Sequence, residues 1–250
     1  MKYVRVIPCL DTYRGVLVKG VKFVDLTNIG NPVEYAKIYE KEGADEIAVL
    51  DIGASVEGRS YLKELVSKIS AEVSVPITAG GGIKSLRDAL EVFRAGASKI
   101  AVNTAAVRNP ELLKELAREL GSSSVVLAID ARRTERGYKV FIEGGRTETT
   151  LDAVEWAVRG ASLGAGEILL TSIDTDGTRS GYDVELIASV SRAVDVPVVA
   201  SGGAGSPLDM LEAVRAGASA VLAASIFHYR VYTIKEVKAY LKEHGIPVRL

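Results

Sequence analysis

Cysteine, histidine and glutamine are scarce or absent in this chain of 250 residues, which has one cysteine, two histidines and no glutamine. The lone cysteine, Cys9, cannot form a disulfide within the chain. His228 and His244 do not form a zinc-binding spacing, and so few histidines give no basis for a Ser-His-Asp or Cys-His arrangement. We expect Cys9 to be buried in its apolar run, and both histidines to lie at the surface or at helix caps.

Long apolar runs and an excess of one charge are also missing. No apolar run reaches the roughly 18 residues that a membrane span needs. The net charge of −1 gives no chain-wide field that would attract nucleic acid or anionic lipid. The chain opens directly on a strand pattern instead of a signal peptide. We therefore expect a cytoplasmic protein with no nucleic-acid partner and no membrane partner.

The chain does contain an internal repeat. Three motifs return 121 positions later, 43–47 at 164–168, 76–82 at 197–203 and 94–98 at 215–219. Short β-branched runs alternate with amphipathic helical stretches throughout, which favours a parallel sheet covered by helices.

Eight strand-and-helix units can be counted along the chain. The strands are expected near 4–10, 46–52, 76–80, 98–103, 124–130, 167–172, 197–201 and 219–224. The helices are expected near 31–42, 57–73, 85–95, 109–119, 151–163, 183–193, 206–216 and 233–243. This α/β pattern predicts a single (β/α)8 TIM barrel domain over 1–250, with half-barrel repeats of about 1–122 and 123–250. An open, doubly wound sheet is the alternative.

Two stretches, 11–30 and 132–148, interrupt this regular alternation of strands and helices. The first separates a strand from its helix by far more than the usual two to six residues, and loops of this kind are often lids. The second alternates around a turn, which predicts a β-hairpin. Both follow the C-terminal ends of strands at equivalent places in the two halves. Active sites of (β/α)8 barrels form at those strand ends.

Two glycine-rich loops, 80–82 and 201–203, follow the third and seventh predicted strands. Glycine lets backbone N–H groups approach an oxyanion closely. Asn103-Thr104 and Ala224-Ser225 end the neighbouring strands and add hydroxyl groups. Because the arrangement occurs once in each half, it predicts a ligand with a phosphate at each end. The alternative for each loop is a tight turn that needs small residues.

Five aspartates lie at or just past strand ends: Asp11, Asp51, Asp130, Asp174 and Asp176. Asp11 and Asp130 end opposite strands of the predicted barrel, so their environments could separate the two pKa values into one acid and one base. For each aspartate the alternative is a helix cap or a turn. Asp174 and Asp176 resemble part of a calcium loop, but no Glu follows at the required spacing. We expect no metal site.

Other charges lie on the first long loop and at the opposite strand ends. Lys19 is on that loop, where a lid lysine could cover phosphates or simply be solvated. Arg5, Glu46, Lys99 and Glu167 open the first, second, fourth and sixth predicted strands. These two cations and two anions would form a ring around the barrel axis. Physical reasoning alone favours a stabilising ion-pair cluster for that ring.

Ten short motifs together resemble one family. They are 9–11, 18–20, 50–52, 80–83, 102–106, 128–131, 170–174, 176–178, 181–183 and 200–205. They are similar to the cyclase subunit of imidazole glycerol phosphate synthase, a lyase of histidine biosynthesis, over essentially the whole chain. The resemblance implies a reaction in which ammonia closes an imidazole ring on phosphoribulosyl formimino aminoimidazole carboxamide ribotide. The products would be imidazole glycerol phosphate and aminoimidazole carboxamide ribotide.

The resemblance also assigns roles to residues, with no cofactor and no metal. Asp11 and Asp130 match the acid and base. The substrate and phosphate positions are Lys19, Asp51, Gly82, Asn103, Thr104, Thr171, Asp176, Gly177, Ser201, Gly203, Ala224 and Ser225. Arg5, Glu46, Lys99 and Glu167 match an ammonia gate, in place of the simple ion-pair cluster. The implied partner is a glutaminase subunit that forms a heterodimer at the N-terminal face of the barrel.

Two other functions remain open from the sequence. The sister sugar isomerase of the same pathway is also a two-fold barrel with two aspartates and a bisphosphate substrate. Its first-strand signature differs from Cys9-Leu10-Asp11. A noncatalytic or engineered barrel scaffold would keep the fold and bind ligands without turning them over.

Overall fold

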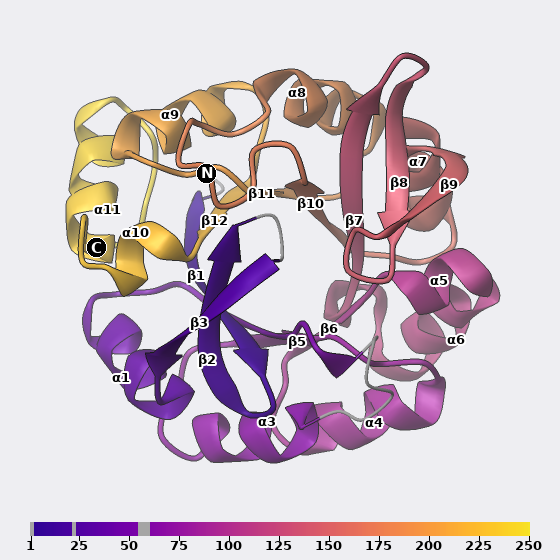
Figure 1. Cartoon of the computed structure of the whole chain (residues 1–250), viewed down its shortest axis with the longest axis horizontal. Coiled ribbons are helices and arrows are strands. Elements are labelled where there is room, and N and C mark those ends of the chain that lie inside the picture. The colour runs from indigo at the N-terminus through magenta and orange to yellow at the C-terminus, as the bar shows by residue number, and fades with distance from the viewer. Residues whose placement is uncertain (1–2, 22–23, 55–60) are drawn as a thin grey trace.

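Eight parallel strands form a closed barrel in the computed structural model, which describes residues 3–21, 24–54 and 61–250 (Figure 1). The barrel strands are β1 (Arg5–Tyr13), β4 (Ile47–Asp51), β5 (Ile77–Gly80), β6 (Lys99–Val102), β7 (Val125–Thr134), β10 (Glu167–Ser172), β11 (Val198–Ser201) and β12 (Ala220–Ala223). Their order is β10-β11-β12-β1-β4-β5-β6-β7, and pairing of β10 with β7 closes the circle. The (β/α)8 prediction is confirmed, and the open sheet is wrong.

Successive residues of each strand point to opposite sides of the barrel wall. Val6 packs outward in the core between strands and helices, whereas Ile7 and Cys9 pack inward. The inward cluster also contains Val126 and Leu169 from the opposite side of the barrel. Both faces of the wall are therefore buried, which explains why the strands read as apolar runs.

Helices cover the outside of the barrel. They are α1 (Pro32–Lys41), α3 (Leu62–Ser70), α4 (Leu86–Arg94), α6 (Glu111–Leu120), α7 (Ala153–Ser162), α8 (Val184–Ala193), α9 (Pro207–Arg215) and α11 (Ile234–Glu243). They fall within the eight predicted ranges, apart from the last residue of α6. Part of the range predicted for α3, 57–60, lies outside the described residues. Capping boxes at Ser206 and Thr233 fix where α9 and α11 begin.

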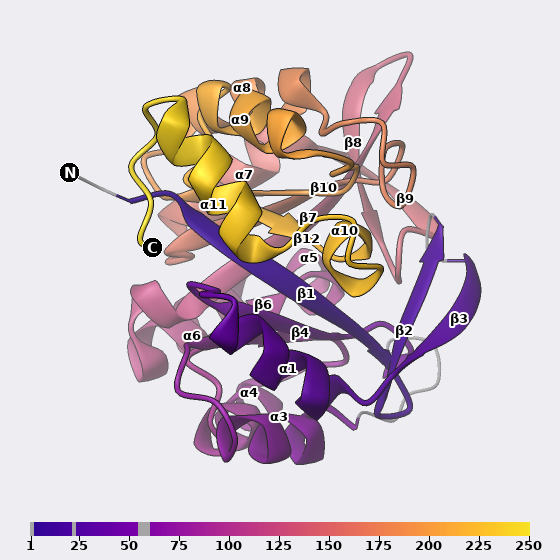
Figure 2. The same cartoon turned by 90° about the vertical axis from the view of Figure 1, so that its left-hand side faces the viewer.

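Both predicted insertions lie at the C-terminal ends of the barrel strands. Strands β2 (Val16–Val21) and β3 (Val24–Gly30) pair antiparallel with each other, and β2 pairs with the end of β1. Strands β8 (Gly137–Ile142) and β9 (Thr147–Asp152) extend β7 in the same way, which confirms the predicted hairpin. Figure 2 shows both insertions at one end of the barrel and the C-terminus at the other. The first insertion is thus paired strand and not an irregular loop.

Three short helical segments complete the described fold: α5 (Thr104–Arg108), α10 (Ser225–His228) and the single 3-10 turn η1 (Ser122–Ser124). Helix α5 follows β6 and α10 follows β12, so each half of the barrel has one short helix directly after a strand. Within the described residues, no helix combines the length and apolarity needed to cross a membrane.

Candidate active site

A cavity of about 620 Å³ opens at the C-terminal end of the barrel. All fourteen residues predicted to act in catalysis or substrate binding line it: Asp11, Lys19, Asp51, Gly82, Asn103, Thr104, Asp130, Thr171, Asp176, Gly177, Ser201, Gly203, Ala224 and Ser225. They come from all eight barrel strands or the connections that follow them. Their convergence makes this cavity, which we call the cup, the candidate active site.

Asp11 lies near the end of β1, and each of its two carboxylate oxygens contacts a different residue. Its Oδ2 is 3.3 Å from Lys19 Nζ, and its Oδ1 accepts a hydrogen bond from Cys9 Sγ at 3.2 Å. Cys9 is buried, as predicted. The cation from the β2 strand therefore faces Asp11 as an ion pair inside the cup.

Asp130 lies across the barrel on β7, with a different set of neighbours. Asn103 Nδ2 donates to Asp130 Oδ2 at 2.9 Å. Burial, followed by repulsion from Asp176, raises the pKa of Asp130 to about 7, although the Asn103 hydrogen bond opposes the shift. Asp130 is therefore poised to gain or lose a proton near neutral pH.

Lys19 on β2 also approaches Asp176, which follows β10. Lys19 Nζ is 4.0 Å from Asp176 Oδ1 as well as close to Asp11. Burial would lower the pKa of Lys19, but the two carboxylates outweigh burial and raise it. Only 9% of Lys19 is exposed, so the alternative prediction of a solvent-exposed lysine is wrong.

The two glycine-rich loops adopt conformations that only glycine tolerates well. Gly81 and Gly203 have φ of +99° and +107°. A Cβ added at Gly81 would lie 2.1 Å from the Asp51 carbonyl oxygen, and one at Gly203 would lie 2.1 Å from the Gly181 oxygen. The loops thus pack directly against neighbouring backbone, and the cup is lined by backbone at these two places.

Asp51 lines the cup, but its carboxylate is engaged with the chain itself. Its oxygens accept hydrogen bonds from the backbone N–H groups of Gly53, Ala54 and Tyr61 at 3.2, 3.1 and 3.0 Å. Asp51 is only 3% exposed. These bonds hold the connection after β4 in place. Asp51 therefore has the turn-forming role that the sequence left open as the alternative to a substrate contact.

Arg5, Glu46, Lys99 and Glu167 form the predicted ring at the opposite, N-terminal end of the strands. Arg5 Nη1 is 2.6 Å from Glu46 Oε2, and Lys99 Nζ is 2.9 Å from both Glu46 Oε2 and Glu167 Oε1. Arg5 Nη2 also pairs with Glu167. Burial would raise the pKa of Glu46, but Lys99 and Arg5 outweigh burial and lower it. Each cation contacts both anions, so the ring is closed.

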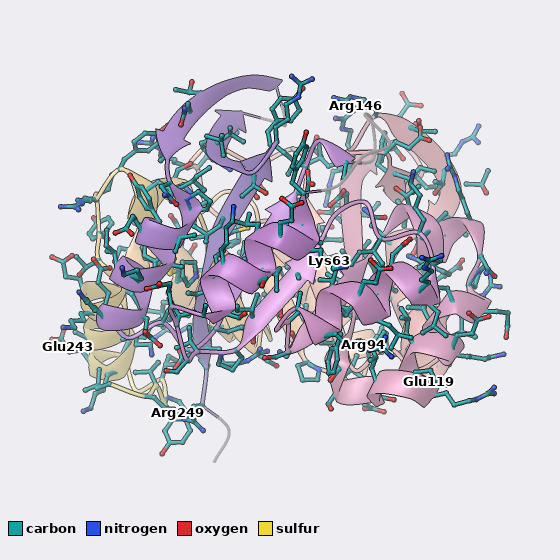
Figure 3. The ribbon with its side chains drawn as sticks, turned by 90° about the horizontal axis from the view of Figure 1, so that it is seen from below. Lys63, Arg94, Glu119, Arg146, Glu243 and Arg249 are labelled. Atoms are coloured by element: carbon teal, nitrogen blue, oxygen red, sulfur yellow. The ribbon has the colours of Figure 1, made fainter. Side chains whose placement is uncertain are left out.

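Four cationic residues of the cup were not predicted: Lys84, Arg108, Arg146 and Arg179. They lie on connections after the strands, whose path the sequence pattern does not specify. Figure 3 places Arg146 at the end of the molecule that carries β2 and β3, far from Arg249. Arg179 has a φ of +57°, and its guanidinium lies 5.1 Å from the Tyr229 ring centroid. These cations place positive charge on the rim of the cup, next to the lining carboxylates of Asp11, Asp130 and Asp176.

The surface or cap prediction is wrong for His228 and holds for His244. His244 is the exposed C-cap of α11. His228 is 4% exposed and lies at the end of α10. His228 packs against Tyr39 of α1, and a lone histidine in the sequence gives no sign of that contact.

The fold and the cup define a (β/α)8 barrel with opposed carboxylates and two glycine-rich loops at one mouth. A family model described as histidine biosynthesis protein matches residues 5–233. The HisF subunit of imidazole glycerol phosphate synthase from Pyrobaculum aerophilum is 57% identical over 248 residues. Those from Thermococcus onnurineus and Pyrococcus furiosus are each 53% identical over 246 residues. Each alignment covers 98% of both chains. This chain belongs to the HisF family of imidazole glycerol phosphate synthase subunits.

Proposed function

We propose that this chain is the cyclase subunit of imidazole glycerol phosphate synthase, and that it works by acid/base catalysis in the cup. Ammonia from a glutaminase partner attacks the bisphosphate ribotide, the imidazole ring closes and the molecule is split. The products are imidazole glycerol phosphate and aminoimidazole carboxamide ribotide. The family relationship and the closed barrel support this assignment.

The observation that carries the catalytic roles is the unequal surroundings of Asp11 and Asp130. Asp11 forms an ion pair with the ammonium group of Lys19, and we assign it the role of the base. Asp130 has a pKa raised to about 7, mainly by burial, so it can deliver a proton near neutral pH and suits an acid. The two groups reach the cup from opposite strands, and a substrate between them would meet one of each.

The two glycine-rich loops are suited to the two phosphates of the substrate. Gly82, Asn103 and Thr104 lie on one side of the cup. Ser201, Gly203 and Ser225 lie on the other, at equivalent places in the second half. Backbone N–H groups and hydroxyls at each place would hold a phosphate, with cationic side chains nearby. A ligand spanning the cup would be centred on the two aspartates.

The ring of Arg5, Glu46, Lys99 and Glu167 supports a route for ammonia through the barrel. It lies at the N-terminal end of the axis and consists of four mutually paired side chains. A glutaminase subunit docked at that face would release ammonia into the barrel and away from bulk water. Ammonia must stay unprotonated to act as a nucleophile, and a closed path serves that purpose.

The decisive experiment is an assay of the purified chain with the bisphosphate substrate and an ammonium salt at alkaline pH, following loss of substrate absorbance. We expect ammonia-dependent turnover to both products. Isomerised substrate without cleavage would identify the sister isomerase, and binding without turnover would identify a scaffold. Adding the cognate glutaminase should confer glutamine-dependent turnover. Full activity with ammonium but none with glutamine would contradict the docking proposal.

A further inference from the structure

One buried polar pair stands outside the roles proposed so far. Tyr39 on α1 and His228 on α10 are 1% and 4% exposed. The Tyr39 hydroxyl is 2.5 Å from His228 Nδ1, and the two rings are stacked with centroids 6.0 Å apart. Burial, with Lys19 adding to it and Asp11 opposing it, lowers the pKa of His228 to about 4. The pair is therefore a neutral hydrogen bond at physiological pH.

Helix α10 depends on tertiary contacts because it is a single turn. It spans Ser225–His228, and a helix of this length has no stability of its own in water. Ser225, at its start, lines the cup, whereas His228, at its end, points away to α1. The bond to Tyr39 connects the end of α10 to α1 through side chains.

Helix α1 provides a rigid support for this bond. Tyr39 is nearly fully buried, and its ring lies 6.2 Å from that of Phe227. Tyr35, one turn earlier, meets the His228 ring edge-on at 5.7 Å. Its ring would also lie 3.2 Å from a Cβ placed at Gly30, where β3 ends. The aromatic cluster thus joins the end of the β2–β3 insertion, α1 and α10.

The other half of the barrel holds its short helix differently. Val107 and Gly160 occupy the positions 121 residues away from His228 and Tyr39, so no such bond can form there. Helix α5 is held from the β8–β9 hairpin, where the backbone N–H of Glu143 donates to Thr104 Oγ1 at 3.0 Å. Arg108 also pairs with Glu143. A change at Tyr39 should therefore affect one end of the cup and leave the other unchanged.

We propose that the Tyr39–His228 hydrogen bond positions α10, and through it Ser225, to receive one of the two phosphates of the substrate. This inference rests on the proposed function, because it concerns one end of the bisphosphate site. Tyr39 and His228 are positioning residues, since neither lines the cup. Removing the bond lets α10 shift relative to the Gly202–Gly203 loop, which weakens phosphate binding at that end alone.

The test uses inorganic phosphate as the probe and the amide resonances of Ser225 and Thr104 as separate reporters of the two ends. In Tyr39→Phe we expect the dissociation constant followed at Ser225 to rise about fivefold, as for the loss of one net hydrogen bond. The constant followed at Thr104 should stay within about twofold of wild type. Tyr35→Phe is the matched control, because it removes a hydroxyl from a ring that contacts His228 only by its edge. Equal constants at Ser225 in wild type and Tyr39→Phe would overturn the inference.

A second variant separates positioning from stability. Tyr39→Phe/His228→Leu removes both polar groups, so thermal stability should largely return. Weak phosphate binding at Ser225 should persist, because α10 still lacks its anchor. Recovery of binding together with stability would show that the pair acts only on the fold. Turnover of wild type with the bisphosphate substrate is measured separately. Absence of turnover in the wild type would contradict the proposed function. The phosphate titration tests the Tyr39–His228 inference separately.

Discussion

Asp11 and Asp130 are chemically identical side chains whose surroundings make them different. Lys19 faces Asp11, whereas Asn103 and the more distant Asp176 accompany Asp130. The two aspartates end repeated strand motifs, yet the repeat does not extend to their partners. One half supplies a lid cation, and no equivalent cation pairs with Asp130 among the described residues. In the proposed mechanism, this difference between side-chain environments separates the acid from the base.

Asp130→Asn is expected to abolish ammonia-dependent turnover and yet stabilise the fold at alkaline pH. The native pKa of Asp130 is about 7 against an ordinary 3.8, so the native state binds this proton more tightly than the unfolded state. This proton stabilises the native state fully below about pH 4, and the stabilisation is lost as pH rises through about 7. Removing the buried charge should add about 4 kcal/mol at pH 8 and little at pH 4.

Urea unfolding of wild type and Asp130→Asn at pH 4 and pH 8 measures this difference, and the ammonia assay measures turnover. Asp11→Asn is the control. It should also lose turnover, but without this pH-dependent gain, because it breaks the ion pair with Lys19. Near-normal turnover in both variants would refute the catalytic assignments.

The conformation of the two glycine-rich loops depends on close contacts with neighbouring backbone more than on side chains. Gly203 approaches the Gly181 carbonyl so closely that no Cβ fits, at a φ of +107°. Gly121, the C-cap of α6, also has a positive φ of +82°, but nothing lies within 4 Å of its Cβ position. Gly203 therefore needs glycine both for its positive φ and for lack of space. The second position needs glycine only for its positive φ.

Gly203→Ala is therefore expected to destabilise the fold by about 2–4 kcal/mol and to raise KM for the bisphosphate substrate. Gly121→Ala carries only the conformational cost, about 1 kcal/mol, and should leave KM unchanged, because Gly121 does not line the cup. Thermal unfolding and steady-state kinetics of both variants check this. Equal effects at the two positions would contradict the close approach at Gly203.

Helix α11 is tied to the barrel by a buried ion pair. Lys238, 3% exposed, donates to Asp45 Oδ1 at 2.8 Å and to the Gly43 carbonyl oxygen at 2.6 Å. Asp45 Oδ2 in turn accepts the backbone N–H of Val6 at 2.8 Å. The Lys238 and Asp45 side chains are 3% and 9% exposed, so each charge depends on the other.

Lys238→Met should lower the free energy of unfolding by about 3–5 kcal/mol, because it leaves the Asp45 carboxylate buried without its cation. Adding Asp45→Asn to this variant should recover part of that loss. Urea denaturation of the two variants and wild type measures both effects. A loss below about 1 kcal/mol for Lys238→Met would show that solvent reaches the pair.

At the scale of the whole molecule, the barrel separates two ends with different chemistry. The cup collects the predicted substrate residues at the C-terminal end, and the ring of Arg5, Glu46, Lys99 and Glu167 closes the N-terminal end. Small and apolar side chains, such as Ala48 and Val126, fill the axis between them. This arrangement suits a protein that takes one reactant from each end.

Lys99→Met tests that separation. Ammonia added to the solution enters the cup from its open mouth, so ammonia-dependent turnover should stay close to wild type. Glutamine-dependent turnover with the cognate glutaminase should fall several-fold, because Glu46 and Glu167 lose the cation between them and the ring rearranges. The ratio of the two rates is the measurement. A parallel fall in both rates would contradict a role in ammonia transfer.

Periodicity and repeats predicted the barrel because each strand is buried on both faces and each helix on one. These burial patterns leave regular marks on the sequence. The same repeat located both glycine-rich loops and both aspartates. The connection of 11–30 was recognised as an insertion, but its pairing with β1 was not predicted, because antiparallel extension depends on where the strand end points.

The sequence by itself determined the barrel and the position of the cup, because strand order in a closed barrel sends every strand end to the same mouth. With the family resemblance, it also named fourteen of the residues that line the cup. Only the tertiary structure decided which partner each side chain meets. It directed Lys19 to Asp11, turned the Asp51 carboxylate onto backbone N–H groups and buried His228 against Tyr39. Such contacts join residues far apart in the chain, and a local pattern carries no record of them.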